Sequence, residues 1–345
     1  MKKLPVVLGS SLTVVFLLTA FPARSVPVET NAPTTKGYAA AVSGLPVDTV
    51  KYEWRDAQRQ RTVPVKIYFP KTGSGPFPVV IFSHGLGGNR DGYEYLGRYW
   101  AQHGYVSVHL QHHGSDSELW QEVPPTEIPK IMQEAVANPQ NAINRPLDVR
   151  FAIDQLTALN QAPGALEKRL DLDRIGVSGH SFGSFTTMAI AGEAFVTPAG
   201  RETSFADPRV KAAVAMSSSV PRDEARWNSA YANIRIPVFH MTGTKDDSPM
   251  GETKAAQRRV PFDRSHGPDQ YLVTFQDGDH MIFSSRQKFQ PGGEKDARFH
   301  DLIAQSATAF WDAYLKQDPK AKTWLADGGF VALLQMDGKF EQKLR

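Results

Sequence analysis

Residues 174–192 read RIGVSGHSFGSFTTMAIAG, with the pentapeptide Gly179-His180-Ser181-Phe182-Gly183 at their centre. An apolar strand pattern precedes the pentapeptide, and a segment with helical character follows it. A serine hydroxyl is a poor nucleophile unless it is held exposed beside a base. A tight turn from strand to helix holds it so only when its neighbours lack bulk, which accounts for the two glycines. The pentapeptide is short enough to arise by chance, so its surroundings decide its meaning.

Short apolar runs typical of buried strands alternate with helical patterns along the chain. The strand patterns lie at 78–83, 105–110, 174–178, 210–216, 236–242 and 271–275, and the helical patterns lie at 92–103, 145–160, 182–192 and 299–316. Residues 48–69 form two segments of period 2, the pattern of an antiparallel strand pair. The alternation predicts parallel strands joined by right-handed crossovers. We therefore expect an α/β fold with a central, mostly parallel sheet flanked by helices and an antiparallel amino-terminal edge.

Two stretches interrupt this alternation, residues 111–144 and 193–209. Loops of this length in a compact domain are usually functional or disordered. The first stretch carries apolar residues with which to pack, so it is either a lid over the site or a surface decoration. Since α/β enzymes often form one unit of about 250 residues or more, we place residues 47–345 in one catalytic domain with 111–144 as an insertion.

The amino terminus has the pattern of a signal peptide over residues 1–25, with Lys2 and Lys3 ahead of an apolar run and small residues near Ser25. An uncleaved anchor is the alternative, but polar residues dilute the apolar run and it is shorter than the roughly 20 residues of a membrane span. Residues 26–46 are rich in Pro, Thr, Ala and Gly and are predicted to be a linker. We expect a secreted or periplasmic protein with no stable membrane span after cleavage.

Composition excludes several kinds of function. The chain has no cysteine, which excludes disulfides, a thiol nucleophile and thiolate metal sites. Its formal net charge is +3, but removal of residues 1–25 would delete three basic residues and no acidic one, leaving 36 basic and 36 acidic residues. Nucleic-acid binding relies on a basic surface that survives processing. We therefore expect no nucleic-acid partner.

Residues able to assist Ser181 follow two later strand patterns. In hydrolases with such a sheet the order is serine, acid, histidine, with each residue just after a strand. Residues 243–247 read GTKDD, in which Asp246 is the preferred acid and Asp247 the reserve. His280 follows the last strand pattern and is the candidate general base. A solvated turn that holds no catalytic acid is the alternative for residues 243–247.

The segment 82–88, FSHGLGG, ends another strand pattern. Its glycines allow backbone amides to approach a substrate oxygen closely. The backbone N–H groups of Leu86 and Phe182 are therefore candidates for an oxyanion hole. A glycine-rich turn that only connects a strand to a helix is the alternative for this segment taken alone.

Three motifs resemble the α/β-hydrolase superfamily, and within it the platelet-activating-factor acetylhydrolases and the dienelactone hydrolase group. They are FSHGLGGNRDGY at 82–93, WAQHGYVSVHLQHHGSDS at 100–117 and IGVSGHSFG at 175–183. The resemblance covers roughly residues 60–285. It implies the α/β-hydrolase fold and a serine esterase with Ser181 as nucleophile and Leu86 and Phe182 as oxyanion donors.

The chain departs from these relatives at two positions. Acetylhydrolases of this type take their acid from just after the strand that follows the nucleophile helix, where residues 216–221 here read MSSSVP. The acid is therefore expected from Asp246, as in the commoner hydrolase arrangement, and a lipid-mediator substrate does not follow from the resemblance. Dienelactone hydrolases have a cysteine where this chain has Ser181, which makes lactone cleavage a distant alternative.

Two further groups of residues are candidates for the site. His109, His112 and His113 form a His-x-x-His-His cluster of a kind that can bind zinc. Few acidic or thiol ligands accompany it, so we expect no metal and expect one of these histidines at the pocket rim. Candidates for the apolar pocket wall, or else for the core, are Trp120, Trp227, Met250 and Phe283.

The sequence predicts hydrolysis of carboxylic esters through a Ser181-His280-Asp246 triad and an acyl-enzyme, without a cofactor. The substrate is expected to be a small-molecule or lipid ester. A peptidase or amidase with the same triad is one alternative, and a large substrate-gating domain would favour it. A non-catalytic binding protein on the same fold is another, and loss of a triad member would favour it.

Overall fold

The computed structural model describes residues 1, 38, 44–197, 200–251, 253–284 and 295–345. Residues 35–345 form one compact unit. The predicted signal peptide, residues 1–25, and the predicted linker, residues 26–46, lie almost wholly outside the described residues, so this division of the chain stays a prediction. No helix within the described residues is both long and apolar enough to cross a membrane.

A nine-stranded sheet forms the centre of this unit, in the order β1-β2-β4-β3-β5-β8-β9-β10-β11. The parallel strands are β4 (Val106–Leu110), β3 (Phe77–Ser83), β5 (Leu170–His180), β8 (Val210–Met216), β9 (Val238–Lys245) and β10 (Gln270–Asp279). At one edge β1 (Val47–Asp56) pairs antiparallel with β2 (Arg61–Pro70), and β2 pairs antiparallel with β4. The predicted mostly parallel sheet with an antiparallel amino-terminal edge is confirmed.

The opposite edge of the sheet was not predicted. There β11 (Gly338–Lys343) pairs antiparallel with β10. A small hairpin of β6 (Ala194–Val196) and β7 (Glu202–Ser204) also lies within the stretch 193–209 that was expected to be irregular.

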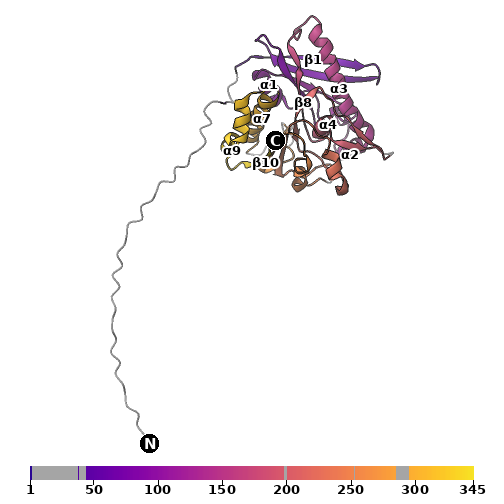
Figure 1. The fold of residues 1–345 in the computed structure, drawn as a ribbon. Helices are drawn as coiled ribbons and strands as arrows, with labels where there is room; N and C mark the ends of the chain where they lie inside the picture. Colours follow the sequence, from indigo (N-terminus) through magenta and orange to yellow (C-terminus); the bar gives the residue numbers. More distant parts are fainter. Residues whose placement is uncertain (2–37, 39–43, 198–199, 252, 285–294) are drawn as a thin grey trace, which may run out of the picture. The chain divides into compact units, whose positions relative to one another are not determined.

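Helices cover both faces of the sheet (Figure 1). One face packs against α1 (Glu94–Gln102), α7 (Asp296–Tyr314), α8 (Pro319–Ala326) and α9 (Gly329–Leu334). The other packs against α3 (Pro139–Gln161), α4 (Phe182–Ala191), α5 (Trp227–Tyr231) and α6 (Val260–Arg264). In β3, Val80 and Phe82 belong to the first core and Val79 and Ile81 to the second. Because successive strand residues point to opposite faces, a strand buried on both sides has a continuous apolar run.

The insertion at 111–144 is largely structured. It contains the short 3-10 helix η1 (Ser117–Leu119) and α2 (Ile128–Ala137), and its last residues already belong to α3. The helix predicted at 145–160 thus begins earlier, at Pro139. The Asn138 side chain caps this end of the helix by accepting a hydrogen bond from the Gln140 backbone N–H at 3.0 Å. Whether this insertion acts as a lid stays a prediction.

Buried histidines make the fold sensitive to acid. Burial lowers the pKa of His112 and of His240 to about 4 and that of His109 to about 3. The unfolded chain takes up these protons as the pH falls below about 6.5, whereas the folded protein does not until about pH 4. The stability that these three histidines contribute is therefore complete above pH 6.5 and is lost as the pH falls towards 4. Burial raises the pKa of Glu193 to about 8 and the hydrogen bond with Asp116 raises the pKa of His113, so these groups act in the opposite direction.

We expect the free energy of unfolding in urea to fall between pH 6.5 and pH 4.5. His240 lies in β9 and its Nε2 is 3.0 Å from Gln270 Oε1. His240→Asn removes one of the titrating groups, so it should reduce the pH dependence by up to about 1.4 kcal/mol per pH unit. An identical pH dependence in the variant and the wild type would contradict this prediction.

Candidate active site

Ser181 occupies the sharp turn between β5 and α4. Its backbone has φ 58° and ψ −116°, a strained conformation for a residue other than glycine. The flanking glycines permit this turn because the chain passes very close to its neighbours. A Cβ on Gly183 would overlap the Ser83 carbonyl oxygen, and a Cβ on Gly179 would overlap the Gly183 carbonyl. The turn presents the Ser181 hydroxyl at the carboxyl end of the parallel strands.

Gly183→Ala should destabilise the protein by roughly 3 kcal/mol, because the added methyl meets the backbone of β3 rather than a side chain that can move away. Urea unfolding measures the effect. Gly44→Ala is the matched control, since nothing lies within 4 Å of a Cβ at that position. Equal free energies of unfolding for the two variants would contradict this prediction, because they would show that the close backbone approach at Gly183 does not affect stability.

A chain of hydrogen bonds joins Ser181, His280 and Asp246. His280 Nε2 lies 2.9 Å from Ser181 Oγ, and His280 Nδ1 lies 2.7 Å from Asp246 Oδ1. His280 directly follows β10 and Asp246 directly follows β9. The carboxylate can accept a hydrogen bond from the Nδ1–H group, which leaves Nε2 unprotonated and able to accept the serine proton. The structure thus brings together the three residues that the sequence singled out.

The environments of the two candidate acids differ. Asp246 is fully buried, and its Oδ2 accepts hydrogen bonds from Ser217 Oγ at 2.7 Å and Thr242 Oγ1 at 2.8 Å. Asp247 is exposed and pairs with Lys254. Ser217 directly follows β8, the position at which the acetylhydrolase pattern has its acid. In this chain the Ser217 hydroxyl occupies that position and donates a hydrogen bond to the carboxylate of Asp246, which follows the next strand, β9.

Arg258 is a functional candidate that sequence analysis missed. It is buried, and its Nη2 lies 3.3 Å from His280 Nδ1 and 3.4 Å from Asp246 Oδ1. Its Nη1 donates to the carbonyl oxygens of Ser217 and Ser218 at 2.8 and 3.0 Å. Burial lowers the pKa of Arg258, and the negative charge of Asp246 opposes that shift. No motif marks this arginine, because only the folded chain brings η3 (Ala255–Arg259) against the triad.

Leu86 and Phe182 border the same cavity as Ser181. Leu86 follows β3, and the preceding Gly85 N–H points to the Tyr93 hydroxyl at 3.4 Å. Phe182 is the first residue of α4, so its N–H has no acceptor within the helix and lies at the positive end of the helix dipole. Two such N–H groups beside a nucleophile can stabilise a developing negative charge on oxygen.

The cavity has a volume of about 410 Å³. Its apolar wall includes Leu86, Met132, Val136, Phe182, Met250 and Met281. Met132 and Val136 belong to α2, so the insertion forms part of the wall. Of the four side chains that were candidates for the pocket wall or else for the core, Met250 alone lines the cavity in the described structure. Phe283 is fully buried in the core, and the indole N–H groups of Trp120 and Trp227 donate to the Gly87 and Pro221 carbonyls.

His109, His112 and His113 do not line this cavity, so the expectation that one of these three lies at its rim is wrong. The side chain of His109 lies beside Ser107 and that of His112 beside Asp148. His113 lies near Asp116 and Glu118, the acidic neighbours that the sequence was expected to lack. The ligand atoms of these last three lie within 4.8 Å of one another, and their ion pairs account for the grouping. The three histidines point to separate partners.

Comparisons with known proteins support the resemblance. Residues 56–127 match the family model described as "Platelet-activating factor acetylhydrolase, isoform II". The chain is 25% identical over 215 residues to a platelet-activating factor acetylhydrolase of the dog, Canis lupus familiaris, covering 54% of this chain and 45% of that protein. It thus spans less than half the length of that relative. The resemblance to acetylhydrolases within the α/β-hydrolases is confirmed, and the family match includes Leu86 but ends before Ser181.

Proposed function

We propose that this protein is a secreted serine hydrolase that cleaves carboxylic esters. The observation that carries the proposal is the hydrogen-bonded series Ser181, His280 and Asp246 at the wall of a largely apolar cavity. Secretion rests on the signal-peptide pattern of residues 1–25.

Catalysis proceeds by acyl transfer in this proposal. His280 Nε2 takes the hydroxyl proton while Ser181 Oγ attacks the ester carbonyl carbon. Asp246 holds the imidazole with Nε2 towards the serine and stabilises the imidazolium. His280 then gives the proton to the departing alcohol, which leaves an acyl-Ser181 enzyme. A water molecule, deprotonated by His280, attacks the acyl carbon. The bond from this carbon to Ser181 Oγ then breaks, His280 returns the proton to Oγ, and the carboxylic acid is released.

The backbone N–H groups of Leu86 and Phe182 bind the carbonyl oxygen as it becomes an oxyanion. Such a donor typically contributes about 3 kcal/mol or more to the stability of the transition state. The triad and the oxyanion hole together need no cofactor.

The substrate proposal follows from the cavity and from the relatives. A cavity of about 410 Å³ with an apolar wall suits an ester with one apolar arm. The relatives' name points to acetyl esters, which fits a short acyl group beside Ser181. We therefore propose small-molecule or lipid esters with a short acyl chain as substrates.

Hydrolysis of p-nitrophenyl esters from acetyl to palmitoyl tests the proposal, with p-nitroacetanilide as the amide counterpart. We expect turnover of esters with an optimum at short acyl chains and little turnover of the amide. Faster amide than ester cleavage would favour the peptidase or amidase alternative. No turnover of any of these compounds by the folded protein would favour a non-catalytic binding protein.

A further inference from the structure

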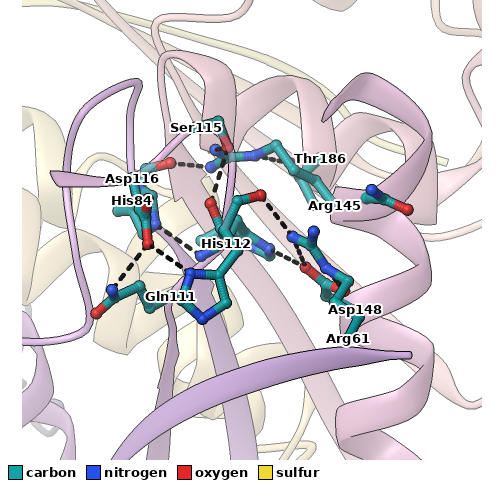
Figure 2. Close-up of polar contacts among 12 residues, drawn as sticks. Arg61, His84, Gln111, His112, Ser115, Asp116, Arg145, Asp148 and Thr186 are labelled. Carbon is teal, nitrogen blue, oxygen red and sulfur yellow. Dashed lines mark hydrogen bonds and ion pairs between the residues drawn. The ribbon is translucent and has the colours of Figure 1, made fainter. Parts of the chain in front are cut away.

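Arg145 is a buried arginine that the proposed mechanism does not use. It lies in α3 and is fully buried. Its guanidinium donates hydrogen bonds to three acceptors from different segments (Figure 2). Nη2 donates to the His84 carbonyl oxygen, Nη1 to Ser115 Oγ at 2.8 Å and Nε to Thr186 Oγ1 at 3.0 Å. One side chain therefore ties the end of β3, the insertion and α4 together.

These contacts reach both halves of the proposed oxyanion hole. The His84 carbonyl is two residues ahead of Leu86, so the guanidinium fixes the loop that carries the first N–H donor. The Arg145 guanidinium carbon also lies 4.5 Å from the centre of the Phe182 ring, and Phe182 carries the second donor. Thr186 is one turn further along the same helix. Arg145 therefore contacts both segments that carry the proposed N–H donors.

The acceptors of Arg145 are all neutral. Among the described residues, no carboxylate forms a hydrogen bond or ion pair with its guanidinium. Burial lowers the pKa of Arg145 to about 9, and the charges of Asp148 and Asp116 only partly oppose that shift. A buried charge without a direct counterion is costly. Here the guanidinium lies next to the loop that carries Leu86 and the start of α4 that carries Phe182. In the proposed reaction a negative charge develops on the substrate oxygen between these two segments.

The loop that follows β3 is also held by hydrogen bonds that do not involve Arg145. The His84 ring accepts a hydrogen bond from the His112 backbone N–H at 3.1 Å, and the His112 ring is bound to Asp148 at 2.9 Å. Arg61 in turn donates to Asp148 at 2.9 Å (Figure 2). The loop is thus fixed from the β2 side as well, and Arg145 adds a hydrogen-bonded connection between the loop and α4 to the close backbone packing at Gly183.

We propose that Arg145 is the positioning residue of the oxyanion hole, holding the Leu86 loop and the start of α4 in register and placing a positive charge behind them. This inference rests on the proposed esterase function. It predicts a defect in transition-state binding rather than in substrate binding, because Arg145 is not among the residues that line the cavity.

The test compares Arg145→Gln, Arg145→Lys and the control Arg150→Gln. Arg150 lies on the same helix, and its guanidinium donates to the Ala206 carbonyl near the surface. For each folded variant, kcat and KM for p-nitrophenyl acetate are measured, together with the affinity for a trifluoromethyl ketone that forms a tetrahedral adduct with the serine. Lysine keeps the charge but loses the planar donor fork.

We expect Arg145→Gln to lower kcat about 100-fold while KM changes by less than about threefold, since a small misplacement of catalytic donors costs about this much. Affinity for the ketone should fall by the same factor as kcat/KM, Arg145→Lys should lie between, and Arg150→Gln should match the wild type. An unchanged kcat, or a raised KM with unchanged ketone affinity, would overturn the inference.

Should both Arg145 variants fail to fold, the double variant Ser115→Ala/Thr186→Val decides. It removes two of the three acceptors and leaves the arginine in place. A folded double variant with kcat at least fivefold below wild type supports the inference, and wild-type kcat overturns it. An inactive wild-type enzyme would instead overturn the proposed function, so the two failures are distinguishable.

Discussion

Ser181→Ala is expected to lower kcat for p-nitrophenyl acetate by at least about 10⁴-fold, because a triad without its nucleophile retains only the contribution of binding and the oxyanion hole. The fold should survive, since alanine differs from serine by one oxygen and that oxygen's hydrogen bond is to His280. Steady-state kinetics measure the loss, and circular dichroism with thermal unfolding verifies the fold.

Ser184→Ala is the matched control for this substitution. Ser184 lies in the first turn of α4 and its hydroxyl pairs with Ser218 Oγ at 2.7 Å. It makes no contact with His280 among the described hydrogen bonds, so the variant should keep its activity within about threefold of wild type. More than a tenth of wild-type turnover in cleanly expressed Ser181→Ala would remove Ser181 from the mechanism.

Asp246→Asn is expected to lower kcat by about 10⁴-fold, the loss known for the same exchange in a serine protease triad. An amide nitrogen facing His280 Nδ1 cannot accept a hydrogen bond from Nδ1–H, so the imidazole would hold the other tautomer and present an N–H group to Ser181. KM should change little because Asp246 is fully buried. Steady-state kinetics on the ester panel measure the effect.

Asp247→Asn is the control, since Asp247 lies next in the sequence but is exposed and accepts a hydrogen bond from the Ala255 backbone N–H at 2.9 Å. Its activity should equal that of the wild type. The reverse ranking of the two variants would make Asp247 the acid, and full activity in both would contradict a triad with an acid from this loop.

Much of the fold could be predicted because buried parallel strands have continuous apolar runs, which identify them in the sequence. The edge strand β11 could not, because its residues, GKFEQK, are mostly polar and have no such run. In the fold it pairs with β10 and contacts α9. The helix α2 was not predicted for a different reason. It lies in the stretch 111–144, which was interpreted from its length as an insertion.

The candidate site followed from one rule, that functional residues come just after strands. The rule located Ser181, Asp246 and His280, which the structure brings together. It could not locate Arg145 or Arg258, because neither residue follows a strand. Their positions depend on how a helix and a 3-10 helix pack against the sheet, and a buried arginine in a sequence looks like any exposed one.

Labelling with a fluorophosphonate tests the central claim most directly, because this reagent reacts with a serine only when a base and an oxyanion hole activate it. Intact-mass measurement and peptide mapping would be applied to the wild type, Ser181→Ala and Asp246→Asn. The account predicts one adduct per wild-type molecule on Ser181, none on Ser181→Ala, and much slower labelling of Asp246→Asn. An unlabelled Ser181 in the folded wild-type protein, or an adduct on another residue, would contradict it.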